Sequence, residues 1–447
     1  MSAPIGVIGL WHLGSVTAAC LAEADHEVIA VDPDSAVVAD LAAGRPPVSE
    51  PGLAELLAGN AARLRFTTDP RDLAGVTQAW VTFDTPVDDE DNADVDWVMA
   101  RLQELLAPLP DGALVIVSSQ LPVGSVAALQ ASCVAGRGLR FACVPENLRL
   151  GAALESFREP DRIVAGVRDE EDRRELAELL APFSRDVQWM RVESAEMTKH
   201  ALNGFLATSV AFIDEVAAVC ESVGADAAEV SRGLKSERRI GPRAYLSPGA
   251  AFAGGTLARD LGFLRALAER HELPAHVFTG VLAGNAAHSH WTRRKLLEIF
   301  GGDGQLAGSS VAIWGLTYKP GTDTLRRSSA VELCRWLADA EVVVQVHDPA
   351  VSTLPLDLRG RIELCATPLE AAAGADALVV CTPWSDYREV PAQALLHALA
   401  QPVVVDPTGL LCSSLAAYPE MRHVWVGRPS PPPAPVAFGL QTREAVG

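Results

Sequence analysis

The sequence is poor in lysine, has no paired cysteine motif and contains no long apolar run. Only four of its 37 basic residues are lysines, so each lysine is a candidate for a specific role. Acidic residues number 57 and the formal charge is −20, and a surface of that sign repels phosphate backbones. Binding of nucleic acid is therefore not expected.

The eight cysteines form neither a CxxC pair nor a zinc-finger spacing, and the N-terminus lacks the basic segment of a secretory signal. These absences predict reduced thiols in a cytoplasmic protein. No apolar run approaches the roughly 18 residues that a membrane-spanning helix needs, so no membrane partner is expected. No metal site is expected, because the acidic segment 88–91 fits no calcium motif. His288 and His290 have no cysteine nearby and are expected on a helix surface.

Residues 4–32 have the pattern of a βαβ unit, in which a short apolar run, a glycine turn, a helical stretch and a second apolar run follow one another. Further apolar strands alternate with helical segments and are predicted at 79–83, 113–118 and 140–144. Such alternation indicates a parallel sheet with helices on both faces. A proline-free helical pattern then predicts helices at 196–223 and 277–300, and a second βαβ pattern begins at residue 311.

The predicted fold class is α/β, with two Rossmann-like doubly wound domains joined by a long-helix middle domain. The expected boundaries are 1–193 for the N-terminal domain, 194–300 for the helical middle domain and 301–428 for the C-terminal domain. A proline-rich tail, residues 429–447, is not expected to join a core.

The turn at residues 9–14 reads GLWHLG, which is the GxGxxG layout of a dinucleotide site with tryptophan at the middle glycine. Gly9 permits the tight turn and Gly14 lets the helix pack on the strand, whereas Trp11 hinders the approach of a pyrophosphate to the helix N-terminus. Asp32 ends the second strand, where a carboxylate accepts the ribose hydroxyls of NAD and repels the extra phosphate of NADP. The pattern predicts NAD, and a Rossmann-like unit without a dinucleotide is the alternative.

Further sequence blocks continue in order along nearly the whole chain. They are AAGRPPVSEPGLAELL soon after Asp32, Thr85-Pro86, LPVGS at 121–125, VPENLRLG at 144–151, AEMTKHALNGF at 195–205, RIGPRAYLSPGAAFAGGTLARD at 239–260, WGLTYKPGTDTLR at 314–326 and VDPTGL at 405–410. With these blocks the sequence resembles the UDP-glucose/GDP-mannose dehydrogenase family. The resemblance implies an NAD-binding first domain, a dimer-forming middle domain and a C-terminal domain that binds the diphosphate of a nucleotide sugar.

The family that the sequence resembles oxidises a hexose C6 alcohol to the aldehyde and then, through a cysteine thioester, to the uronic acid. By this resemblance, Lys199, Asn203 and Asp260 match the lysine, the asparagine and the water-holding aspartate that stabilise the alcohol oxygen. Lys199 and Asn203 stand four residues apart and are expected on one face of a helix. Lysine at this position in an arginine-rich chain favours the catalytic role over that of a surface charge.

The position that matches the family's catalytic cysteine, in its GGxCxxKD motif, is Thr256. A threonine hydroxyl without an adjacent base is a weak nucleophile, so a thioester route is closed. By the same resemblance, Glu146 remains as a candidate base for the hydrolytic water. The family's second carboxylate, a phenylalanine and a water-holding threonine are replaced by Leu150, Asn147 and Gln120. The alcohol-oxidising residues are present, whereas those for the acid-forming step are altered.

The resemblance also assigns binding residues. Those expected to contact NAD are Gly9, Trp11, Leu13, Gly14, Asp32, Thr85 and Arg326. Those expected to contact the nucleotide sugar are Leu148, Arg149, Arg239, Tyr245, Gly249, Gly254 and Lys319. The other two lysines, Lys235 and Lys295, are expected at the surface. Substitutions relative to the family at Thr324, Arg327 and Thr408 indicate a substrate other than standard UDP-glucose.

Three functions are compatible with these residues. The first is an NAD-dependent oxidoreductase that acts on a nucleotide-activated sugar by a single two-electron alcohol oxidation, or by transient oxidation and reduction as in an epimerase. The second is a conventional four-electron 6-dehydrogenase that uses Thr256. The third is a catalytically inactive protein that binds a nucleotide sugar. The altered residues favour the first function, in a protein expected from the resemblance to be a homodimer.

Overall fold

Parallel strands covered by helices occur twice in the computed structural model, which describes residues 3–86, 93–133, 138–149, 151–253 and 255–428. The chain divides into a first unit, residues 1–205 and 254–278, and a second unit, residues 206–253 and 279–447. Gly254, Leu150, the acidic segment 88–91 and the proline-rich tail lie outside the described residues.

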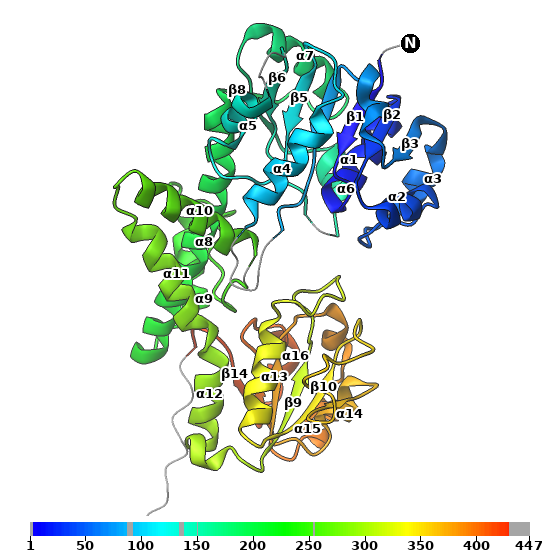
Figure 1. The fold of residues 1–447 in the computed structure, drawn as a ribbon. Helices are drawn as coiled ribbons and strands as arrows, with labels where there is room; N and C mark the ends of the chain where they lie inside the picture. The colour runs from blue at the N-terminus through cyan, green and yellow to red at the C-terminus, as the bar shows by residue number, and fades with distance from the viewer. Residues whose placement is uncertain (1–2, 87–92, 134–137, 150, 254, 429–447) are drawn as a thin grey trace, which may run out of the picture. The chain divides into compact units, whose positions relative to one another are not determined.

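The first unit is built on an eight-stranded sheet with the order β3-β2-β1-β4-β5-β6-β7-β8 (Figure 1). Its strands are β1 (Ile5–Ile8), β2 (Val28–Val31), β3 (Leu64–Thr67), β4 (Gln78–Val81), β5 (Leu114–Val117), β6 (Arg140–Cys143), β7 (Ile163–Gly166) and β8 (Val187–Met190). Neighbouring strands run parallel except β6 and β7, which meet antiparallel at Cys143 and Gly166. The winding reverses between β1 and β4, the switch point at which doubly wound folds bind ligands.

Helices cover both faces of this sheet, as predicted. The helices of the first unit near the sheet are α1 (His12–Glu23), α2 (Ser35–Ala42), α3 (Leu53–Gly59), α4 (Val95–Leu106), α5 (Ser125–Cys133), α6 (Ala153–Arg158) and α7 (Glu170–Leu180), with the beginning of α8 (Val192–Val223). The unit also contains α10 (Thr256–Arg270), which lies beside α8 (Figure 1). Side chains alternate along β1, so that Ile5 and Val7 belong to one apolar core and Ile8 belongs to the other. Each face of the sheet therefore has its own core.

The second unit contains a fully parallel six-stranded sheet with the order β11-β10-β9-β12-β13-β14. Its strands are β9 (Ser310–Trp314), β10 (Val343–His347), β11 (Glu363–Leu364), β12 (Ala377–Val380), β13 (Val403–Val405) and β14 (Arg422–Val424). Its helices, besides the end of α8, are α9 (Ala227–Ser236), α11 (His276–Ser289), α12 (Trp291–Phe300), α13 (Ser329–Asp339), α14 (Pro368–Ala372), α15 (Ala392–Ala398) and α16 (Cys412–Leu415). The prediction of two doubly wound sheets and a long helix is confirmed.

Two details of the helical predictions differ from the structure. The helix expected at 277–300 is divided into α11 and α12 at His290, which precedes the first residue of α12. In the described part of the chain, α8 is the one helix long and apolar enough to cross a membrane by length and composition. Core helices of soluble proteins pass the same test, and 44% of its apolar window is buried.

Candidate active site

The turn between β1 and α1 has the backbone that its glycines were predicted to permit. Gly9 has a φ of +93°, and a Cβ atom there would lie 2.8 Å from the ring of Phe83. A Cβ atom on Gly14 would lie 1.8 Å from the carbonyl oxygen of Gly9. Close packing thus accounts for both glycines. Trp11, the residue before α1, is half exposed at the helix N-terminus.

Asp32 lies at the end of β2 beside this turn. Its carboxylate accepts hydrogen bonds from the backbone N–H groups of Leu10 at 2.7 Å and Asp34 at 2.9 Å. Burial raises the pKa of Asp32, and these two bonds oppose the shift. The strand order, the tight turn and this carboxylate fit the adenosine half of NAD. Of the other predicted contacts, Leu13 is buried and Thr85 donates its hydroxyl to the Gln120 carbonyl at 2.7 Å.

A buried glutamate that the sequence analysis did not single out connects the turn to the segment 144–151. Glu50 lies 3.1 Å from Nε2 of His12 and accepts the backbone N–H groups of Gly151 at 2.9 Å and Ala153 at 2.7 Å. The side chain of Glu50 is almost fully buried. The glutamate of the EPGL block therefore holds the loop before α6 against the beginning of α1.

Replacing Glu50 by alanine should lower the free energy of unfolding by about 2–4 kcal/mol, because two backbone N–H groups and His12 lose their acceptor. Urea unfolding of the variant measures this loss. Glu55→Ala, at an exposed position of α3, is the matched control and should change the free energy by less than about 0.5 kcal/mol. Equal effects of the two substitutions would contradict the role assigned to Glu50.

Asp260 of α10 is the centre of the predicted catalytic cluster and is fully buried. Its Oδ1 atom lies 3.1 Å from Nδ1 of His200 and accepts the Gln120 amide at 2.5 Å. Its Oδ2 atom accepts the amide of Asn203. Three side chains from two separate segments thus converge on one carboxylate, which confirms that Asn203 and Asp260 meet.

His200 is a member of this cluster that sequence reasoning missed. Its Nε2 atom lies 2.9 Å from the carbonyl oxygen of Leu121, which can only accept, so Nε2 carries a proton. His200 thus connects the carbonyl of Leu121 to the carboxylate of Asp260. Helical spacing from Asn203, three residues later, was the available signal.

Lys199 lies on the same part of α8, and its side chain is only 11% exposed. Its Nζ atom is 3.8 Å from Oε2 of Glu146. The interpretation of Lys199 as a surface charge is therefore wrong. Both residues border a hollow whose empty volume of about 370 Å³ includes space open to solvent, together with Ser119, Gln120 and His200. The hydroxyl of Ser119 is buried without a hydrogen-bond partner and is available to a polar ligand.

Gln120 links the cluster to the neighbouring residue of α10. Its amide nitrogen donates to Asp260, and its amide oxygen accepts from the Arg259 guanidinium. Both ends of the Gln120 amide are thereby used. Thr256, which stands at the predicted cysteine position, is the first residue of α10 and is exposed.

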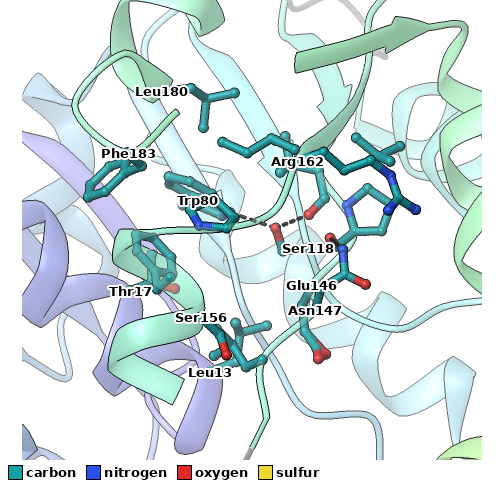
Figure 2. Close-up of a pocket in the computed structure, with 17 residues that line it drawn as sticks. Leu13, Thr17, Trp80, Ser118, Glu146, Asn147, Ser156, Arg162, Leu180 and Phe183 are labelled. Carbon is teal, nitrogen blue, oxygen red and sulfur yellow. Dashed lines mark hydrogen bonds between the residues drawn. The ribbon is translucent and has the colours of Figure 1, made fainter. Parts of the chain in front are cut away.

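An apolar hollow adjoins the polar one, with an empty volume of about 570 Å³ that includes space open to solvent (Figure 2). The two hollows share Ser118, Pro145 and Glu146. Ser118 accepts the indole N–H of Trp80 at 2.7 Å and donates in turn to the carbonyl of Val144. Glu146 therefore lines both the polar hollow, which Lys199 also lines, and the apolar hollow, which is lined by Leu13, Asn147 and Leu148 among others.

In the second unit, two buried side chains contact the backbone of Gly249, a predicted substrate residue. Asp214 accepts its N–H at 3.1 Å, and the Nε2 atom of His288 lies 2.7 Å from its carbonyl oxygen. His288 is only 8% exposed, so its expected place on a helix surface is wrong. Tyr245, in the same segment, is exposed.

Asp214→Asn should stabilise the protein above neutral pH. Burial raises the pKa of Asp214 to about 7 from the ordinary 3.8, and its Oδ2 atom has no hydrogen-bond partner. The folded state therefore binds the proton of Asp214 more tightly than the unfolded state does. The stability that this proton contributes is fully present below pH 3.8 and is lost as the pH rises through 7.

Asparagine keeps an acceptor for Gly249 and carries no charge. Urea unfolding at about pH 8 should show the Asp214→Asn variant to be more stable by about 1–3 kcal/mol, with the difference vanishing at about pH 4. Glu215→Gln, at the next and exposed position, controls for the loss of one charge on α8. A pH-independent difference would contradict the assignment of the shift to Asp214.

The remaining predicted substrate residues lie in varied surroundings. Leu148 packs against the apolar core that contains Ile5 and Val7. Arg149 is exposed and lies 3.8 Å from Asp161. Arg239 is exposed and donates to Glu237 at 3.1 Å. After β9, Lys319 is half-buried and Arg326 is exposed.

Lys295 is not the surface residue that was expected. It is nine-tenths buried and lies 3.0 Å from both Glu221 and Glu298. Lys235 donates to Ser247 at 3.1 Å.

In the parts of the chain that the structure describes, no group of three His, Cys, Asp or Glu side chains could hold a metal ion.

Comparison with known proteins assigns the family. The models of the UDP-glucose/GDP-mannose dehydrogenase family match three segments: the NAD binding domain at 3–184, the central domain at 193–287 and the UDP binding domain at 312–412. The chain belongs to this family. It is thus an NAD-dependent oxidoreductase of nucleotide sugars, and it binds its substrate's nucleotide through a UDP-binding domain.

Relatives cover almost the entire chain. The UDP-glucose 6-dehydrogenase of Pseudomonas aeruginosa is 34% identical over 443 residues, which are 95% of this chain and 97% of that protein. The enzyme of the same name from Rhizobium meliloti is 33% identical, with 95% and 99% covered. The structure of a UDP-glucose dehydrogenase from Pyrobaculum islandicum is 30% identical and superimposes with a TM-score of 0.82, covering 91% of this chain and 94% of that one.

Proposed function

We propose that this enzyme oxidises the primary alcohol of a nucleotide-activated sugar once and releases the aldehyde. The observation that carries the proposal is the side chain of Gln120, which donates to Asp260 at 2.5 Å and accepts from Arg259. The resemblance to the family puts a water-holding threonine at this position. In this chain an amide, with both ends already bonded, occupies that side of Asp260.

The residues of the polar hollow suit the removal of a proton from an alcohol. NAD, when bound, supplies the acceptor for the hydride. Lys199 is a compact cation beside Glu146, and the side-chain amide of Asn203 lies one helical turn away on α8. A developing alkoxide next to Lys199 is stabilised by this cation in a site that excludes most water. The contact of His200 with Asp260 at 3.1 Å holds the carboxylate beside Asn203 during this step.

The acid-forming step lacks its two requirements. A thiolate would trap the aldehyde, but the exposed residue at the start of α10 is Thr256, whose hydroxyl is a weak nucleophile at neutral pH. A hydrolytic water would then be needed, and Gln120 fills the place at Asp260. Glu146 could act as a base, but it replaces neither the thiolate nor the residue that holds the water. The aldehyde is therefore the expected product.

Counting NADH per molecule of sugar tests this proposal. Purified enzyme is incubated with NAD and a panel of UDP- and GDP-sugars, and the total NADH at completion is compared with the sugar consumed. One NADH per sugar is expected. Two would show the four-electron oxidation, and none, with an epimer as product, would show that the hydride is returned. None without any product would show a protein that only binds the sugar.

We also infer that the protein acts as a cytoplasmic homodimer. An exposed apolar stripe on α8 supports the dimer, because its members stand at helical spacing and are between 51% and 70% exposed: Phe205, Phe212, Val219 and Val223. The seven cysteines whose side chains are described are all free, as in a reducing compartment. Phe212→Asp should shift the molar mass in light scattering from two chains to one, and Glu215→Gln should not. A wild-type monomer would refute the dimer.

A further inference from the structure

Three helices of the second unit hold one segment of the chain, residues 245–252, through side-chain contacts with its backbone. The hydroxyl of Ser231 on α9 donates to the carbonyl of Leu246. The side-chain amide of Asn285 on α11 donates to the carbonyl of Phe252 at 2.9 Å. Two further contacts, from α8 and α11, lie midway between these bonds. The segment is thus tied to the helices near both ends and in the middle.

Asp214 and His288 supply the contacts in the middle of the segment, one on each side of Gly249. Asp214 accepts the Gly249 N–H group, and His288 donates to the Gly249 carbonyl, because a carbonyl oxygen can only accept. The Nε2 atom of His288 also lies 3.7 Å from Oδ2 of Asp214, so the two side chains lie next to each other. Both side chains are more than nine-tenths buried, and water does not easily replace either contact.

The segment reaches the edge of the second sheet at which a ligand is expected. A Cβ atom on Gly249 would lie 4.0 Å from the carbonyl oxygen of Pro407, two residues after the end of β13. Doubly wound sheets bind their ligands outside the carboxyl ends of their strands. Helices α8 and α11 pack closely, since a Cβ atom on Gly284 would lie 2.6 Å from a side-chain oxygen of Glu215. Closely packed helices therefore fix the middle of the segment at the ligand-binding edge.

We propose that Asp214 and His288 are positioning residues that set the affinity of the enzyme for the nucleoside diphosphate of its substrate, because they hold residues 245–252 at the carboxyl edge of the second sheet. This role rests on the contact with the nucleotide sugar that the family resemblance assigns to Gly249, and not on the number of electrons transferred to NAD. With Gly249 held on both sides, the segment has its binding conformation before the ligand arrives. If either contact is lost, ligand binding must order the segment, and this ordering lowers the affinity.

Isothermal titration calorimetry of the full chain with UDP tests this role without turnover. His288→Leu removes the donor to the Gly249 carbonyl and should weaken the binding of UDP about tenfold. His288→Gln places an amide N–H near the position of Nε2, and it should recover most of the affinity. Asp214→Leu should weaken the binding of UDP to a similar extent. The double variant should lose little more than either single variant, because both contacts hold the same part of the backbone.

The affinity for NAD separates this role from a general loss of structure. The NAD binding domain lies at 3–184, so the affinity for NAD should be unchanged in every variant. His276→Leu removes an exposed histidine at the start of α11 and should change neither affinity. Circular dichroism shows whether each variant is folded. Because UDP binding requires no hydride transfer, the count of NADH per sugar has no bearing on the outcome.

A second position keeps the role testable if His288→Leu does not fold. Asn285→Ala, at a half-buried position, releases the Phe252 carbonyl and should weaken the binding of UDP severalfold. Unchanged affinity for UDP in folded His288→Leu, or in Asn285→Ala where that variant replaces it, would overturn the role. Equal losses of affinity for UDP and NAD would overturn it as well. So would a His288→Gln variant that binds UDP no better than His288→Leu.

Discussion

Replacing Lys199 by methionine is expected to lower kcat by about a thousandfold, with little change in the affinity for NAD. The Nζ atom is the cation in the polar hollow, 3.8 Å from Glu146, and a developing alkoxide there would lose its counter-charge. Methionine preserves the length and apolar stem of the side chain. Steady-state kinetics with a nucleotide sugar, followed by NADH absorbance, measures the change.

Two further variants separate this loss from a loss of fold or of general charge. Lys199→Arg keeps the charge but replaces a compact ammonium by a planar fork, and it should also lose most of the rate. Arg45→Met removes an exposed cation from the end of the α2 segment and should retain full activity. A Lys199→Met enzyme with more than about a tenth of the wild-type rate would contradict the assigned role.

The double substitution Thr256→Cys with Gln120→Thr is expected to convert the product from aldehyde to uronic acid. A thiolate at the start of α10 would add to the aldehyde carbon to form a thiohemiacetal. Transfer of its hydride to a second NAD, with loss of the hydroxyl proton, would leave a thioester. Removal of the Gln120 amide frees one side of Asp260 for water, and Glu146, which lines the same hollow as Gln120, is the candidate base. The yield of NADH per sugar should rise from one toward two.

The two single variants show which substitution limits the acid-forming step. Thr256→Cys alone should trap aldehyde covalently and turn over slowly, because Gln120 still occupies the water site. Gln120→Thr alone should leave the product as aldehyde. Mass spectrometry of the intact Thr256→Cys protein detects the covalent adduct. Acid production by the wild type at the rate of the double variant would contradict the account.

Much of the fold follows from local patterns in the sequence. Short apolar runs predicted β4, β5 and β6 to within a residue or two, because strands of a parallel sheet that is covered on both faces have few polar residues. Strands β7 and β8 were not predicted, and β8 is only partly buried at the sheet edge, so its apolar pattern is weak. Helix α11 has few buried residues, so periodicity neither ended it before His290 nor placed His288 inside.

The candidate site was predictable where its residues share a helix or a motif. Lys199 and Asn203 stand one turn apart, and that spacing alone puts them together. The bonds of Gln120 and His200 to Asp260 join residues 140 and 60 positions apart, and no local rule predicts such tertiary contacts. The same holds for Glu50, whose partners lie 38 to 103 residues away.

The identity of the product after quenching with borodeuteride tests the central claim most directly. Borodeuteride reduces an aldehyde to an alcohol that carries one deuterium on carbon, and it leaves a carboxylate unchanged. The wild-type reaction with NAD and its nucleotide sugar is predicted to yield the starting sugar with one deuterium at the oxidised carbon. A uronic acid without deuterium, as the main product, would contradict the proposal that Gln120 and Thr256 stop the reaction after one oxidation.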